Sequence, residues 1–197
     1  MIKRRQFIAG LGSAAVWPVA ARAQQRERMR RIGVLMNLAS DDPESADRAA
    51  ALAQGLAELG WTVGRNVQIV PRWAVGDPER FRRYAGELVA LAPDVILANG
   101  GATVGPLLQA TRTVPIVFAG VADPVGAGFV DSLARPGGNA TGFMSAEFSI
   151  AGKWLELLKQ IAPGVTRVAV LRTSNTPGGP AQFGAIQVPR HLLGAPP

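Results

Sequence analysis

The chain has 197 residues, of which 48% are hydrophobic and none is cysteine, a length that suits one domain or one domain and part of another. Without cysteine there are no disulfides, thiol nucleophiles or cysteine-ligated metals, and the single histidine, His191, excludes a multi-histidine metal site. The first 23 residues hold four of the 21 basic side chains and no acidic one. The rest of the chain carries 17 basic and 14 acidic groups, a net charge of only +3, so we expect no nucleic-acid partner. We also expect no metal and no cofactor.

The first 23 residues have the three parts of an export signal. A positive segment, residues 3–5, precedes a mostly apolar stretch over residues 7–21, and Ala21-Arg22-Ala23 is a small-x-small cleavage signature. The pair Arg4-Arg5 resembles a twin-arginine signal, and a Sec signal that carries two arginines is the alternative. We predict that residues 1–23 are a cleaved signal peptide and that the mature protein is periplasmic.

Short apolar runs alternate with helical patterns in the next 90 residues. Helix starts are predicted at Asp42 and Asp77, each followed by Pro and Glu, and a short third helix is predicted after Gly100-Gly101. Pro71 places the second strand at a sheet edge. The four runs that are typical of buried strands are residues 31–37, 66–73, 94–99 and 115–120. This order predicts an α/β fold with a doubly wound parallel sheet.

The glycine-rich stretch 123–143 is the next feature. Asp123-Pro124 is predicted to end the fourth strand, residues 135–138 to form a tight turn, and residues 139–143 to form a last strand. A helix over residues 145–161 and an apolar strand over 167–172 are predicted to follow. After that the pattern breaks: residues 177–197 include nine Gly or Pro, so no further helix is expected.

Ligands of open α/β sheets bind beyond the carboxyl ends of the strands, where four predicted loops meet. Polar side chains and the amides at the start of the third helix could hold a small polar solute there, although each residue alone could equally cap a helix or a turn. A dinucleotide site is disfavoured because the loop after the first strand, "NLASDDPES", has no glycine. A serine hydrolase would need a Gly-x-Ser-x-Gly turn, which is absent.

Several passages together resemble one known family. They are "RIGVLMN", "LAQGLAELGWTVGRNVQI", "PIVFAGVADPVGAGFVDSLARPGGNATGF" and "KWLELLKQIAPGVTRVAVL". In these passages the chain resembles the substrate-binding proteins of ABC transporters, of the type I-like periplasmic-binding-protein class and the TrpX-like group. The resemblance implies a two-lobed receptor that is not an enzyme. Such a receptor closes on a small organic solute, of which an amino acid is one candidate, and delivers it to an ABC permease in the inner membrane.

The resemblance also implies domains and a site. The first lobe is expected over residues 31–143, the start of a second lobe over 144–187, and an irregular tail over 188–197. Because members of the family continue further, we expect this chain to be truncated within its second lobe and impaired in ligand capture. An exported α/β hydrolase-type enzyme and a ligand-sensing module are the alternatives. The positions that match the first-lobe wall of the cleft are Asn37, Ser40, Gly101, Ala102, Thr103 and Asp123.

Overall fold

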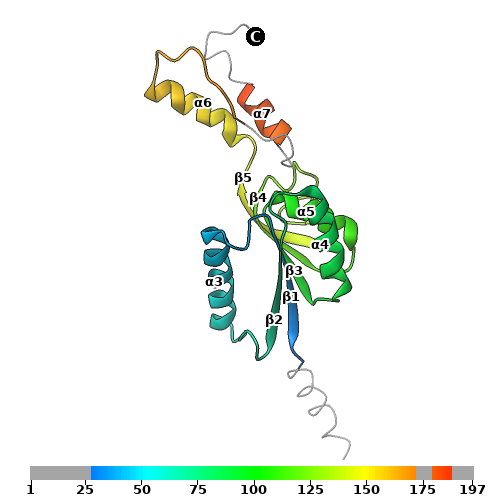
Figure 1. The fold of residues 1–197 in the computed structure, drawn as a ribbon. Coiled ribbons are helices and arrows are strands. Elements are labelled where there is room, and N and C mark those ends of the chain that lie inside the picture. The colour runs from blue at the N-terminus through cyan, green and yellow to red at the C-terminus, as the bar shows by residue number, and fades with distance from the viewer. Residues whose placement is uncertain (1–27, 172–178, 188–197) are drawn as a thin grey trace, which may run out of the picture.

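The computed structural model describes residues 28–171 and 179–187 (Figure 1). The predicted signal peptide, the tail after residue 187 and His191 lie outside these residues. Five parallel strands form one sheet in the order β2-β1-β3-β4-β5. Their bounds are β1 Arg30–Met36, β2 Val67–Trp73, β3 Val95–Asn99, β4 Ile116–Ala122 and β5 Ala140–Ala146. The predicted α/β class is confirmed, and β2 with Pro71 lies at a sheet edge as predicted.

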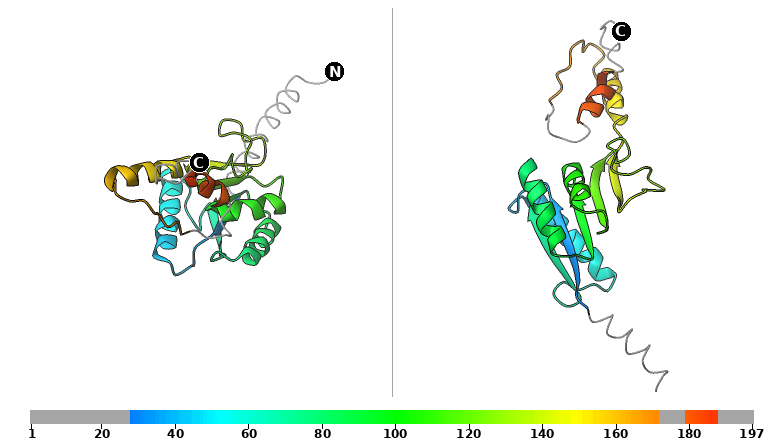
Figure 2. Two further views of the ribbon diagram at one scale, coloured as in Figure 1. Left: turned by 90° about the horizontal axis from the view of Figure 1, so that it is seen from above. Right: turned by 90° about the vertical axis from the view of Figure 1, so that its right-hand side faces the viewer.

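Three helices flank the sheet. Helix α3, Pro43–Glu58, lies on one face, and α4, Pro78–Ala90, and α5, Gly101–Ala110, lie on the other (Figure 1; Figure 2). The predicted helix starts are confirmed, because the Asp42 carboxylate accepts the Glu44 amide at 2.9 Å and the Asp77 carboxylate accepts the Glu79 amide at 2.8 Å. This winding brings the carboxyl ends of all five strands to a single edge.

The hydrophobic core lies between the sheet and the pair α4 and α5. Its fully buried members include Leu35, Leu88, Ile96, Leu107 and Phe118. Helix α3 contributes little by comparison, since the only one of its residues that is buried is Ser45. The two faces of the sheet are therefore stabilised very unequally, because the free energy gained scales with the apolar area removed from water.

The end of the described chain corrects three predictions. The helix predicted over residues 145–161 is α6, Ile150–Ile161, because β5 continues to Ala146 and takes up the start of that stretch. Residues 167–171 form no strand, since no described strand pairs with them. A helix, α7, Gly179–Gln187, lies where none was predicted, and it packs against α6. Local helix–helix contact thus outweighs the Gly and Pro content of this region.

The glycine-rich stretch forms the connection between β4 and β5 and then β5 itself. Gly137 has a φ of 80°, as the predicted tight turn requires. Gly142 of β5 pairs with Phe118 of β4, and a Cβ atom added at Gly142 would overlap the backbone of Phe118. The absence of a side chain at residue 142 is therefore a condition for the pairing of β4 and β5.

The substitution Gly142→Ala is expected to lower the free energy of unfolding by about 2–3 kcal/mol, because the new methyl group forces β5 away from β4. Gly138→Ala is the matched control, since a Cβ atom there meets nothing within 4 Å and its φ is not positive. Urea unfolding of the two variants checks this, and equal midpoints would contradict the close approach.

At the amino edge of the sheet, Asp94 ties the start of β1 to β3. Its carboxylate accepts the Arg31 amide at 2.8 Å and the Arg30 guanidinium at 2.6 Å. The Arg31 amide first, and then the Arg30 guanidinium, hold the pKa of the Asp94 carboxyl below its ordinary value. A carboxyl whose pKa is lowered by folding stabilises the fold above its unfolded pKa and loses that effect as the pH falls through its folded pKa.

We therefore expect Asp94→Asn to lower the free energy of unfolding by about 1–2 kcal/mol at pH 7, since the charge-assisted bonds are weakened. The difference from the parent chain should shrink below about pH 4, where the carboxyl begins to protonate in the unfolded parent chain. Chemical unfolding from pH 3 to pH 7 tests this, with the exposed Asp47→Asn on α3 as control. A difference that does not change with pH would mean that the ionised Asp94 carboxylate does not provide this stability.

Candidate functional site

The carboxyl edge of the sheet collects three of the predicted site segments. Asn37 and Ser40 follow β1, Gly101 to Thr103 begin α5 directly after β3, and Asp123 follows β4. Because β1, β3 and β4 are neighbours in the sheet, these loops are neighbours as well. Asn37 and Asp123 thus lie at one edge of the sheet, although they are 86 positions apart in the chain.

Asn37 lies against Gly100, the residue that precedes α5. The Nδ2 atom of Asn37 is only 2.9 Å from the place that a Cβ atom of Gly100 would occupy, and Gly100 has a φ of 85°. The Oδ1 atom of Asn37 is buried and has no hydrogen-bond partner among the described residues. A buried carbonyl oxygen without a donor is costly, so this atom is available to a donor from outside the described residues.

The first turn of α5 differs from those of the two helices that share its edge. Helices α3 and α4 are each capped by an aspartate, whereas the N-cap of α5 is Gly100, which has no side chain to offer. The amides of a first helical turn lack partners within the helix, and they carry the positive end of the helix dipole. The N-terminus of α5 is therefore the one start of these three that is open to an external acceptor.

The remaining predicted residues take supporting positions. The Thr103 hydroxyl is fully buried and donates to the Gly100 carbonyl at 2.7 Å, so its side chain holds the first turn of α5. The Asp123 carboxylate accepts the Gly126 amide at 2.7 Å, and Asp123 has a φ of 40°. Ser40 is exposed in the loop before α3.

Sequence reasoning missed Arg48 on α3. Its guanidinium donates to the Asn99 side-chain oxygen at the end of β3 and pairs with Glu44 at 2.5 Å. Asn99 is itself buried. The Glu44–Arg48 spacing of four residues was visible in the sequence, but the contact with Asn99 spans 51 positions and depends on the topology. Arg48 brings a positive charge to the same edge.

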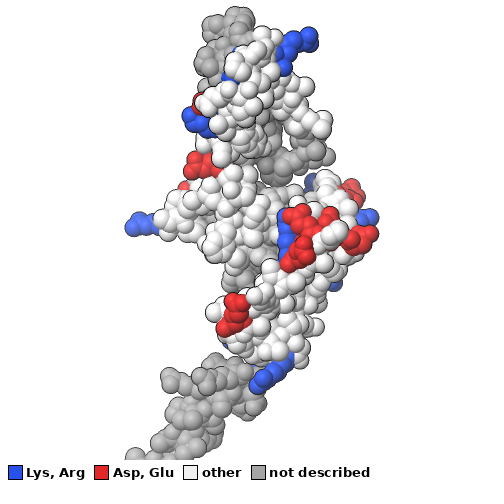
Figure 3. Space-filling view, turned by 90° about the vertical axis from the view of Figure 1, so that its left-hand side faces the viewer, with Lys and Arg blue, Asp and Glu red and all other residues white. Residues whose placement is uncertain are grey.

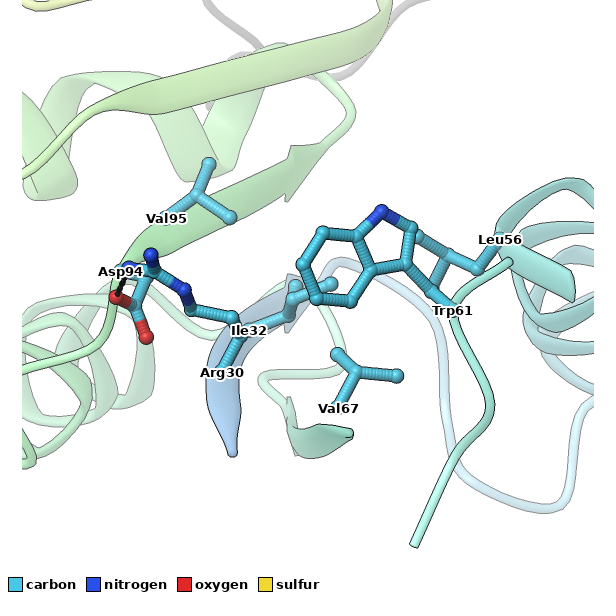
Figure 4. A pocket seen from close by; sticks show the side chains of 7 residues that line it. All are labelled: Arg30, Ile32, Leu56, Trp61, Val67, Asp94 and Val95. Atoms are coloured by element: carbon cyan, nitrogen blue, oxygen red, sulfur yellow. Dashed lines mark hydrogen bonds and ion pairs between the residues drawn. The ribbon is translucent and has the colours of Figure 1, made fainter. Parts of the chain in front are cut away.

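An apolar pocket of about 350 Å³ lies at the opposite, amino edge of the sheet (Figure 4). Trp61 faces the ion pair of Arg30 and Asp94 across it, and Ile32 and Val67 form its floor. It is bounded by the end of α3, whose packing on the sheet is sparse. None of the predicted site residues lines this pocket, so it is separate from the carboxyl-edge site.

The described residues contain no group of three or more acidic or histidine side chains that could hold a metal ion. Within residues 28–171 and 179–187, no helix has both the length and the hydropathy to cross a membrane.

Comparison with known proteins agrees with this architecture. The sequence profile of the family described as ABC transporter substrate binding protein matches residues 32–178, well over half of the chain. The chain belongs to this family. The resemblance stated from the sequence is thus confirmed, and members of the family bind solutes and are not enzymes.

Relatives of this substrate-binding protein are known in sequence and in structure. A tyrosine-binding protein of Clostridioides difficile is 31% identical over 128 residues, which are 64% of this chain and 36% of that protein. A conserved domain protein of Vibrio cholerae has a TM-score of 0.75 at 28% identity, and a Streptococcus pneumonia ABC domain in complex with L-Trp has 0.73 at 27%. In both structures the match covers 83% of this chain and 54% of the other. The substrate-binding protein thus spans about half the length of these solved relatives.

Gly100→Ala in this substrate-binding protein should destabilise the fold by about 1 kcal/mol through its positive φ and by about 1 kcal/mol more by displacing Asn37. Gly60→Ala measures the cost of a positive φ without a side-chain contact, since Gly60 has a φ of 84° and nothing within 4 Å of an added Cβ atom. Gly100 also has a ψ of 152°, so its own backbone cost is at least as large. Thermal and urea unfolding of both variants measure the difference. If the two variants are equally destabilised, Asn37 does not pack against Gly100.

Proposed function

We propose that this chain binds a small organic solute of the amino-acid class at the carboxyl edge of its sheet. The first-lobe contacts would come from Asn37, Ser40, Gly101, Ala102, Thr103 and Asp123. The bound solute is handed to an ABC permease of the inner membrane. The family membership supports a solute and a permease as partners.

The observation that carries the proposal is the pairing of an open helix start with an unpartnered oxygen. The amides of Gly101 and Ala102 in the uncapped first turn of α5 suit a carboxylate. The buried Oδ1 atom of Asn37, beside Gly100, suits a donor such as an ammonium group. The protein thus offers donors for a carboxylate next to an acceptor for an ammonium group. An α-amino acid carries these two groups on one carbon atom.

The relatives support the same solute class. The relative at 31% identity is called a tyrosine-binding protein, and the Streptococcus pneumonia structure is described in complex with L-Trp. Residues 1–23 fit an export signal, which supports action outside the cytoplasm, in the periplasm, with the twin-arginine route proposed. These points extend the proposal to an exported receptor for aromatic or other small amino acids.

We also propose that the 197-residue chain captures its solute weakly. Its described residues supply a single sheet, and α6 and α7 lie beyond the carboxyl edge of that sheet (Figure 1). A cleft closed from two sides buries most of a small ligand, whereas one wall leaves much of its surface in water. The affinity of this chain should therefore be on the order of millimolar, about −4 kcal/mol of binding free energy.

The substitution Asn37→Asp separates the site from the fold. The new carboxylate would lie at the N-terminus of α5, where it stabilises the helix and competes with the carboxylate of the solute for the free amides of the first turn. We expect unchanged or slightly raised thermal stability together with at least a roughly tenfold loss of affinity for L-tryptophan and L-tyrosine. Ligand-observed NMR titration measures the affinity, and the decarboxylated amines serve as a matched pair that should lose no affinity.

Two results would contradict these proposals separately. Absence of binding by every carboxylate solute up to about 50 mM would overturn the proposed function of this chain. Micromolar affinity in the parent chain would keep the function but overturn the proposed weakness.

A further inference from the structure

The loop after β2 lies at the carboxyl edge of the sheet, and no site residue has been assigned to it. It is a four-residue turn over residues 74–77, closed by the Asp77 amide, which donates to the Ala74 carbonyl at 3.0 Å. The two central residues, Val75 and Gly76, have φ values of 54° and 72°. Positive φ at both central positions is typical of a type I′ turn, which prefers asparagine, aspartate or glycine there.

Valine is a costly residue at the first central position of this turn. Its branched Cβ atom crowds the backbone at positive φ, so a β-branched residue with this conformation is an outlier. Two other non-glycine residues of the described chain have positive φ, and each has a local reason for it. Ala92 follows the end of α4, where a left-handed residue is common, and Asp123 is of a residue type that tolerates this region. Neither reason applies to Val75.

Packing within the chain does not account for the valine either. Its side chain is 51% exposed, whereas a valine that served the core would be buried. Glycine or asparagine would form the same turn without the steric cost. Backbone strain that the surrounding structure does not explain is concentrated at sites that bind ligands, where it holds a side chain in a required place. The strained turn therefore marks Val75 as a candidate for contact with a ligand.

The sheet fixes where this turn lies relative to the proposed solute site. The Ala74 amide donates to the Met36 carbonyl at 2.9 Å, and Met36 directly precedes Asn37. The loop that carries Val75 is thus about one strand spacing, roughly 5 Å, from the loop that carries Asn37. A solute whose ammonium group lies at Asn37 reaches across this spacing with an aromatic or a long aliphatic side chain. The methyl group of alanine is too short to do so.

We propose that Val75 is a specificity-determining residue, whose exposed methyl groups contact the apolar side chain of the bound amino acid. This role rests on the proposed function and deepens it, because it names the part of the solute that the site selects. The preferred solutes are amino acids with an aromatic or a long aliphatic side chain. The strained turn keeps the valine at the surface of the edge, where water covers it until the solute side chain replaces that water.

The charged groups near this loop favour an apolar contact as well. The Asp77 carboxylate caps α4 and lies 3.4 Å from the Arg80 guanidinium, and Glu44 pairs with Arg48 at 2.5 Å where α3 borders the edge. These charges are engaged within the protein. In the space-filling view the upper part of the molecule, which contains α6 and α7, is mostly uncharged, with few blue and red groups (Figure 3). An uncharged solute side chain suits these surroundings.

The substitution Val75→Gly separates the strain from the contact. We expect the thermal midpoint of the 197-residue chain to rise by about 3 °C, because glycine adopts positive φ freely. The affinity for L-tryptophan should fall at least roughly fivefold, because the apolar contact is lost. The affinity for L-alanine, whose side chain does not reach residue 75, should change by less than about twofold. Circular dichroism measures the midpoint, and ligand-observed NMR titration measures both affinities.

Two further variants isolate the cause. Val75→Thr keeps the branched shape and the strain but replaces a methyl group by a hydroxyl, so it should leave the midpoint unchanged and weaken L-tryptophan binding at least roughly twofold. Ala92→Gly is the matched control, since it relieves a positive φ at the opposite edge of the sheet. It should raise the midpoint and leave the affinities for both solutes unchanged.

The outcomes distinguish this role from the proposed function. A Val75→Gly chain that binds L-tryptophan as tightly as the parent would overturn the role of Val75 and leave the proposed function standing. An equal loss of affinity for both solutes would also overturn it, because the turn would then shape the site without contacting the solute side chain. A thermal midpoint that falls in Val75→Gly would contradict the strain. A parent chain that binds neither solute would overturn the proposed function and the role of Val75 together.

Discussion

The close packing of α4 onto the sheet is the constraint on which the rest of the structure depends. Gly33 favours it, because a Cβ atom there would be only 3.3 Å from side-chain atoms of Leu88 and Ile96, which is tighter than an ordinary contact. With α4 and α5 fixed on one face, β1, β3 and β4 are held in register and their loops come to a common edge. The placement of Asn37 beside the first turn of α5 is a consequence of that one-sided core.

Much of the fold followed from the sequence because its signals are local. Asp42 and Asp77 cap helices through amides only two or three residues away, and Pro71 marks an edge wherever it lies in a sheet. Predictions failed where a partner decides the structure. The run at 167–171 has the pattern of a strand, yet no described strand pairs with it, and α7 forms against α6 despite its glycines.

The candidate site shows the same division. The topological rule that ligands bind beyond carboxyl strand ends makes Asn37 and the start of α5 candidates from the sequence, and they remain a prediction. It could not show that the Oδ1 atom of Asn37 is buried without a partner, or that the Thr103 hydroxyl is used within the helix. Both facts depend on side-chain positions. The Arg48 contact with Asn99 could not be foreseen for the same reason. It joins α3 to the end of β3, 51 positions further along the chain.

The unequal burial of the two sheet faces has a consequence for how the molecule opens. Helix α3 buries only Ser45 and borders an apolar cavity, so it contributes little to the cooperative core. Such an element detaches in excursions that cost far less than global unfolding, and its amides exchange with solvent early. Because α3 carries Arg48 and follows the loop that holds Asn37 and Ser40, these excursions would loosen one border of the solute edge while the core stays folded. The proposed solute edge is thereby built partly from a sparsely packed element, which gives it freedom to adapt that the opposite face lacks.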